Sequence, residues 1–262
     1  MQDITLWQGD CLELMKNIPD GSVDLTVTSP PYDNLRTYNG NIDQWNFEKF
    51  KDIAKELYRV TADGGVIVWI VADATIKGSE TGTSFRQALW FMDCGFNLHD
   101  TMIWCKSGGG AVGSNKCYTQ NFEYMFIFSK GKPKAINLIK DVRNKNAGQK
   151  LSNSERRKST GERRKGVKRT VNEFSKRSNW WCVFQQSNNK TGHPAVFPEQ
   201  LANDHIISWS NEGDTVLDCF MGSGTTGVAC VNTNRHFVGI ELDDGYFDIA
   251  RNRIEQARKG GE

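Results

Sequence analysis

The sequence predicts an α/β protein with a doubly wound, mostly parallel sheet. Stretches with strand character alternate with stretches of helical spacing along most of the chain, an order that places helices on both faces of such a sheet. The run VIVWIVA, residues 66–72, is apolar throughout, as in a strand buried on both faces. Residues 214–243 read as a strand, a glycine-rich turn, a helix and a second strand, which is the layout of a nucleotide-binding βαβ unit.

The individual elements follow from apolar spacing and from the residues that interrupt it. Strands are expected at residues 4–8, 24–28, 66–72, 97–105, 124–128, 215–219 and 237–241. Helices are expected at residues 10–17, 47–60, 84–94, 198–210, 228–233 and 244–259. Only about twenty residues follow Glu241. The start of the chain must therefore complete the half-sheet around the glycine-rich turn.

Length and composition suit a globular protein with one large α/β domain or two small ones. The chain has 262 residues, of which 38% are hydrophobic and 24% charged. No apolar run is long enough to span a bilayer, and the N-terminus does not resemble a signal peptide, so we expect a cytoplasmic protein without a membrane partner. Seven cysteines are scattered without a C-x-x-C pair. We therefore predict neither a metal site nor a disulfide framework.

The net charge of +2 hides a strongly basic segment. Residues 140–180 hold fourteen Lys or Arg against four Asp or Glu, whereas the rest of the chain holds nineteen basic and twenty-seven acidic residues. Apolar periodicity is weak here, so we expect an insertion, 140–180, between two parts of one domain, 1–139 and 181–262. Such charge asymmetry points to a polyanionic partner.

Two short motifs stand at the ends of expected strands. SPPY, residues 29–32, ends the strand 24–28, and its two prolines make the following backbone rigid and remove two donors. GSGTTG, residues 222–227, fits G-x-G-x-x-G, and Glu241 ends the next strand, where an acid can bind ribose hydroxyls. The hexapeptide alone would also suit an ordinary turn or a nicotinamide oxidoreductase.

With SPPY near the start and FMGSGTT near the end, the chain resembles the S-adenosylmethionine-dependent DNA amino-methyltransferases, in the permuted group called β. GDCLELM (9–15), NFEYMFIFSKG (121–131) and HPAVFP (193–198) also match that family in its order. The resemblance implies a seven-stranded methyltransferase sheet with an inserted target-recognition region, S-adenosyl-L-methionine as cofactor and double-stranded DNA as partner. It implies a prokaryotic or phage-encoded enzyme and leaves open a homodimer and a cognate restriction nuclease. A DNA-binding relic without turnover is the non-enzymatic alternative.

The resemblance assigns the catalytic role to Ser29, Pro30, Pro31 and Tyr32. The Ser29 hydroxyl and the Pro30 carbonyl would accept hydrogen bonds from the exocyclic amine of the target base, and the prolines would hold both acceptors in place. Tyr32 would stack on a base rotated out of the duplex.

The cofactor-binding residues implied by the family are Asp10, His193, Phe197, Asp218, Phe220, Gly222, Ser223, Gly224, Thr225, Thr226 and Glu241. Phe220 would pack on the adenine, Asp10 would bind its amine and Glu241 the ribose. Asp218 would lie near the cofactor's amino group, and Thr225 or Thr226 would contact its carboxylate. Gly222 and Gly224 would let the methionine portion approach.

The basic segment is expected to meet the DNA backbone, because clustered basic side chains release counterions from phosphates. The residues concerned are Arg156, Arg157, Lys158, Arg163, Arg164, Lys165, Lys168 and Arg169.

The choice of target atom follows from two details of the family pattern. Methylation at C5 of cytosine uses a cysteine that usually follows a proline, and none of the six prolines here precedes a cysteine. Among the amino-methyltransferases, serine before the two prolines is usual for cytosine, and aspartate or asparagine for adenine. Ser29 therefore favours N4 of cytosine, with N6 of adenine as the alternative.

Overall fold

The computed structural model describes residues 2–32, 45–106, 118–152, 156–157, 160–164, 168–183 and 197–260. It divides into two compact units. Unit 1 comprises Met1–Asn137 and Asn179–Glu262, and unit 2 comprises Leu138–Ser178. Among the described residues, no helix is long and apolar enough to cross a bilayer.

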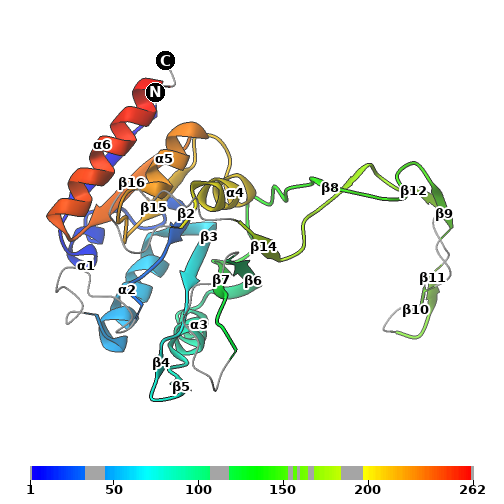
Figure 1. Ribbon diagram of the computed structural model, residues 1–262, viewed down its shortest axis with the longest axis horizontal. Helices are drawn as coiled ribbons and strands as arrows, with labels where there is room; N and C mark the ends of the chain where they lie inside the picture. Colours follow the sequence, from blue (N-terminus) through cyan, green and yellow to red (C-terminus); the bar gives the residue numbers. More distant parts are fainter. Residues whose placement is uncertain are drawn as a thin grey trace. The chain divides into compact units, whose positions relative to one another are not determined.

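Unit 1 is built on an eight-stranded sheet with the order β1-β16-β15-β2-β3-β7-β6-β14 (Figure 1). Its strands are β1 (Ile4–Gln8), β2 (Val23–Thr28), β3 (Thr61–Val71), β6 (Asn97–Cys105), β7 (Phe122–Ser129), β14 (Trp180–Cys182), β15 (Thr215–Asp218) and β16 (His236–Glu241). All neighbouring pairs are parallel except β3–β7 and β6–β7, in which β7 runs antiparallel. The sheet is therefore mostly parallel, as predicted, with β14 as a short additional edge strand.

The start of the chain completes the half-sheet near the C-terminus, as predicted. Strand β1 pairs with β16, and β2 pairs with β15, both in parallel. Segments more than 180 residues apart in sequence thus lie side by side. This pairing brings the turn after β2 next to the turn after β15.

Helices cover both faces of the sheet. They are α1 (Cys11–Met15), α2 (Phe47–Val60), α3 (Thr83–Asp93), α4 (Glu199–Trp209), α5 (Thr225–Asn232) and α6 (Asp244–Gly260). Side chains of α1, α2 and α3 share one buried cluster, and those of α4, α5 and α6 share another. Strand β3 alternates between the two, with Val68 in the α4–α6 cluster and Trp69 in the α1–α3 cluster. A strand buried on both faces explains why its sequence is apolar throughout.

Helix boundaries follow the capping residues. Asn46 caps α2 by accepting a hydrogen bond from the Lys49 backbone N–H at 2.9 Å. Helix α5 begins at Thr225, three residues earlier than expected, because the left-handed Gly224 (φ 79°) ends the glycine-rich turn there. Two further strands, β4 (Thr75–Ile76) and β5 (Ser79–Glu80), form a small hairpin between β3 and α3.

Unit 2 contains three antiparallel pairs nested in sequence, β8–β13, β9–β12 and β10–β11. The strands are β8 (Val142–Arg143), β9 (Lys150–Ser152), β10 (Arg156–Arg157), β11 (Arg163–Arg164), β12 (Lys168–Thr170) and β13 (Phe174–Ser175). Nested pairing is the pattern of a two-stranded ribbon. The sequence predicted no regular structure here, because a ribbon without a buried face has no need of apolar alternation; even Val142 and Phe174 are exposed.

Candidate active site

The predicted motifs meet at the carboxyl edge of the sheet. Asp10, Glu241, Asp218 and Ser29 lie at or just beyond the ends of β1, β16, β15 and β2, which are neighbours in the sheet. Ligands of open α/β sheets bind in the crevice outside this edge. Strand β7 runs the other way, so its first residues, including Glu123, lie at the same edge.

Asp218 is buried between β2 and α5. Its carboxylate accepts hydrogen bonds from the hydroxyl of Thr28 at 2.6 Å, the hydroxyl of Thr226 at 2.7 Å and the backbone N–H of Phe220 at 3.2 Å. Burial raises the pKa of Asp218 to about 6, although the three hydrogen bonds act in the opposite direction. The carboxylate thus ties together the two strands that carry the motifs.

Glu241 is fixed by the backbone on both sides. One carboxylate oxygen accepts from the N–H of Gly222 at 2.7 Å and the other from the N–H of Asp243 at 2.9 Å. Burial raises the pKa of Glu241, and the two backbone hydrogen bonds partly oppose this. The remaining lone pairs of a carboxylate held in this way can accept from a ribose diol.

The residues of the glycine-rich turn differ in their surroundings. Gly222 has a φ of 54° and lies beside Glu241. A Cβ on Gly224 would instead lie 2.9 Å from the Cβ of Ala250, so Gly224 serves the contact of α5 with α6. Thr226 is fully buried and donates its hydroxyl to Asp218. The contact of Thr225 or Thr226 with the cofactor carboxylate stays a prediction.

Ser223 and Thr225 lie close to a basic side chain. Both are buried, and Arg253 of α6 lies with its Nη1 3.1 Å from the Ser223 hydroxyl and 3.4 Å from the Thr225 hydroxyl. Arg253 was not predicted as a site residue.

Asp10 is held by two contacts. It caps α1 through the Leu12 N–H at 2.9 Å, and its other oxygen forms an ion pair with Lys49 Nζ at 2.6 Å. Burial raises the pKa of Asp10, but the hydrogen bonds and charge of Lys49 and the backbone N–H groups outweigh burial, so the pKa lies below its ordinary value. Lys49 was not foreseen, since a lysine on an amphipathic helix is usually a solvated one.

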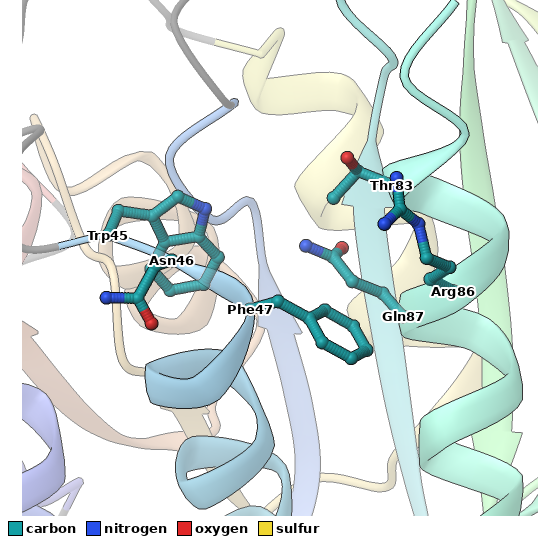
Figure 2. A pocket seen from close by; sticks show the side chains of 6 residues that line it. All are labelled: Trp45, Asn46, Phe47, Thr83, Arg86 and Gln87. Atoms are coloured by element: carbon teal, nitrogen blue, oxygen red, sulfur yellow. The ribbon is translucent and has the colours of Figure 1, made fainter.

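Phe220 faces an aromatic neighbour. Its ring lies 5.4 Å from that of Trp45, edge to face, and 6.3 Å from that of Trp69. Trp45 also lines a pocket between the beginnings of α2 and α3, shown in Figure 2. The residues around this pocket are Trp45, Asn46, Phe47, Thr83, Arg86 and Gln87.

The SPPY turn joins a hydrogen-bonded chain. Ser29 Oγ lies 2.9 Å from Tyr32 Oη, which lies 2.7 Å from Glu123 Oε2. The other oxygen of Glu123 forms an ion pair with Lys106 Nζ. Tyr32 is 6% exposed, so a base stacked on its ring requires a rearrangement around it. Glu123 was not predicted, although a carboxylate inside the apolar run FEYMFIF was a visible signal.

Several predicted residues have no described side chain. His193, Lys158 and Lys165 lie outside the described residues. Five others are placed in the ribbon by their backbone alone, namely Arg156, Arg157, Arg163, Arg164 and Lys168. Arg169 is exposed, and Phe197 packs against the cluster formed by α4, α5 and α6.

The residues at the sheet edge fit the parts of S-adenosylmethionine. Glu241 has free lone pairs for a ribose diol, Phe220 and Trp45 offer aromatic surface for an adenine, and Asp218 offers a carboxylate for an ammonium group. The donor set therefore suits a nucleoside that also carries a charged amino acid.

The family model N6_N4_Mtase, described as DNA methylase, matches residues 23–252. The orphan methyltransferase M.BamHII of Bacillus amyloliquefaciens is 52% identical over 250 residues, which cover 92% of each chain. The type II methyltransferase M.HpaI of Haemophilus parainfluenzae is 28% identical, over 96% of this chain and 74% of that protein.

Solved structures share the fold. The PvuII DNA methyltransferase (cytosine-N4-specific) is similar with a TM-score of 0.71 and 21% identity, over 100% of this chain and 94% of that one. The M1.HpyAVI–SAM complex is similar with a TM-score of 0.66 and 24% identity, over 96% and 98%. The family match and the 52%-identical relative show that this chain belongs to the N6/N4 DNA methylase family, as an S-adenosylmethionine-dependent DNA methyltransferase.

Proposed function

We propose that this enzyme methylates the exocyclic N4 of a cytosine rotated out of DNA. The observation that supports the proposal most is the position of Ser29. This residue comes directly after β2 at the carboxyl edge of the sheet, next to the turn that binds the cofactor in the family. Serine at this position is usual for cytosine in the family. N6 of adenine is the alternative target in the same enzyme class.

The proposed reaction requires the protein to activate a weak nucleophile, the exocyclic amine of the target base. The lone pair of an exocyclic amine is delocalised into the base ring, and acceptors at its N–H groups favour the pyramidal form. Ser29 Oγ and the Pro30 carbonyl supply such acceptors, and Pro31 stiffens the turn that presents them. When bound, S-adenosylmethionine supplies an electrophilic methyl group. Tyr32 contributes its ring to the base pocket.

Methylation at a ring carbon has no support among the described cysteines near the site. That reaction needs a thiolate, and Cys11 and Cys219 are the cysteines packed beneath the motifs. Both are buried, and burial raises the pKa of the Cys11 thiol to about 12 and that of Cys219 well above its ordinary value. Neither thiol is available as a nucleophile at neutral pH.

The remaining residues divide between cofactor and DNA. At the cofactor, Glu241 holds the ribose, Phe220 packs on the adenine, Asp10 lies at the adenine amine and Asp218 at the ammonium group. Ser223 and Thr225 lie towards the carboxylate, and Phe197 and His193 flank the site.

Unit 2 is proposed as the target-recognition element. A two-stranded ribbon is one of the shapes that the major groove of DNA admits. Arg156 pairs with Arg164, and Arg157 with Arg163, so four arginines share the β10–β11 pair. This charge density suits phosphate contacts on either side of the groove.

Nucleoside mass spectrometry tests the proposal directly. The protein is incubated with unmethylated genomic DNA and isotope-labelled S-adenosylmethionine, and the digested nucleosides are identified. We expect labelled N4-methylcytosine. Labelled N6-methyladenine would contradict the cytosine assignment while keeping the enzyme class. No labelled nucleoside would favour a DNA-binding relic.

A further inference from the structure

Glu123 is a buried carboxylate beside the proposed catalytic residues and is not one of them. It is 4% exposed and is the second residue of β7. Its carboxylate contacts Tyr32 on one side and Lys106 on the other. A buried charge is costly even when paired, and an apolar residue of similar volume is often as stable. Stability alone therefore does not explain a carboxylate at this position, and we look for a function.

The donors and acceptors in the hydrogen-bonded chain from Ser29 to Glu123 follow from the number of hydrogens that each group can donate. An ionised carboxylate can only accept, so Tyr32 donates its one hydroxyl hydrogen to Glu123. The Ser29 hydroxyl, 2.9 Å from Tyr32 Oη, then donates its hydrogen to Tyr32. The lone pairs of Ser29 Oγ remain for an incoming N–H, and its hydrogen does not oppose the target amine.

We propose that Glu123 is a positioning residue that orients Ser29 as an acceptor through Tyr32 and takes up the proton released by the target amine. Lys106 stabilises the carboxylate by its ion pair. The inference rests on the proposed amino-methyl transfer and holds for a cytosine or an adenine amine alike.

The proton transfers balance along the chain. The amine lone pair forms the new N–C bond, while the S–C bonding pair stays on sulfur, which becomes neutral. The amine, now positively charged, gives one N–H proton to Ser29 Oγ. Ser29 passes its own proton to Tyr32, and Tyr32 passes its own to Glu123, which becomes a neutral carboxylic acid. Solvent then removes that proton and restores the carboxylate.

Glu123→Gln tests the proposal because the amide keeps the shape of the side chain but reverses the direction of the hydrogen bonds from Ser29 to residue 123. Lys106 has only donors, so the amide carbonyl turns to Lys106 and the NH2 group turns to Tyr32. Tyr32 then donates to Ser29, whose hydrogen points at the target amine. We expect the single-turnover rate of methyl transfer to fall about 100-fold or more, with dissociation constants for S-adenosylhomocysteine and DNA within about threefold of wild type.

A double variant separates orientation from a general loss of structure. In Glu123→Gln/Lys106→Gln, the amide at 123 is free to turn its carbonyl back to Tyr32. We expect this variant to regain at least about tenfold of the lost rate, because hydrogen bonding to Tyr32 is restored although proton uptake is not. A merely structural role predicts a double variant no faster than the single one, and that result would overturn the proposal.

Two further variants complete the experiment. Tyr32→Phe removes only the hydroxyl at the middle of the chain and should slow transfer as much as Glu123→Gln does. Asp24→Asn is the matched control, because Asp24 is also paired with a lysine, Lys134, but at the other end of β2. It should transfer methyl groups at the wild-type rate.

The outcomes for the two proposals differ. A Glu123→Gln or Tyr32→Phe rate within threefold of wild type overturns the relay and leaves the methyl transfer in place. Wild-type transfer to adenine overturns the cytosine assignment and leaves the relay to be judged by its variants. No transfer to DNA by the wild type overturns both.

Discussion

Asp218, at the proposed cofactor site, affects how the stability of the protein depends on pH. It is buried, and its pKa of about 6 in the folded state lies above the ordinary value of 3.8. A raised pKa means that the folded protein favours the protonated acid. The associated stability is fully present below pH 3.8 and is lost as pH rises through about 6. A cofactor ammonium at this position would compensate for the charge at neutral pH.

Asp218→Asn should remove this pH dependence, because the amide stays neutral and keeps the volume of the side chain. Between pH 4 and 7 the free energy of unfolding of the wild type should fall by about 2–3 kcal/mol relative to the variant. Urea unfolding at a series of pH values, without cofactor, measures this difference. Parallel curves for the two proteins would show that Asp218 titrates normally in the folded state.

His205 acts in the opposite sense and makes the paired comparison necessary. Burial lowers its pKa to about 3 from 6.5, so its stability contribution is present above pH 6.5 and is lost as pH falls. The wild type alone therefore shows the two effects superimposed. The histidine is present in both proteins, so it cancels from the difference between them.

The glycine-rich turn shows that a motif can predict a residue correctly without revealing why that residue is needed. The sequence identified both glycines from the G-x-G-x-x-G spacing, and the family pattern assigns both to the cofactor. The structure explains the need for glycine at residue 224 differently: Ala250 and Ile254 of α6 lie too close to Gly224 to leave room for a Cβ. Sequence spacing cannot reveal this, because α6 is some twenty-five residues away and its contact depends on how two helices cross.

Gly224→Ala should therefore destabilise the protein even without cofactor. Gly213 is the matched control, since its φ of 80° resembles the 79° of Gly224 but nothing lies within 4 Å of an added Cβ. Gly213→Ala should cost about 1 kcal/mol from backbone strain, and Gly224→Ala about 1–3 kcal/mol more from overpacking. Denaturant unfolding measures both. Equal losses would mean that α6 accommodates the methyl group.

Elements with a large buried face were predictable from the sequence. Helix α2 occupies the residues expected for it, because several consecutive turns repeat the same apolar spacing. Strand β14 and the unit 2 ribbon were missed, since two- and three-residue strands are too short to show a period. The contact of Tyr32 with Glu123, 91 residues apart, was equally invisible, because only the sheet order brings them together.

The division of charge between the two units leads to a prediction about DNA binding. Unit 2 spans most of the segment that carries the excess of basic residues, and its strands β10 and β11 consist of arginines alone. If these arginines contact phosphates, each contact releases counterions, and affinity depends steeply on salt. The sheet edge that we propose to bind the cofactor belongs wholly to unit 1, so DNA affinity and cofactor affinity should respond to different substitutions.

Replacing Arg156, Arg157, Arg163 and Arg164 by glutamine should weaken DNA binding and flatten its salt dependence. The slope of log K against log salt should fall by about 0.9 for each phosphate that the variant no longer neutralises, while S-adenosylhomocysteine binds as in the wild type. Fluorescence anisotropy across a salt series measures the slope. A control variant neutralises four exposed basic residues of unit 1, namely Lys55, Arg251, Arg258 and Lys259. If that control flattens the slope as much as the ribbon variant does, the effect comes from net charge rather than from an interface on unit 2.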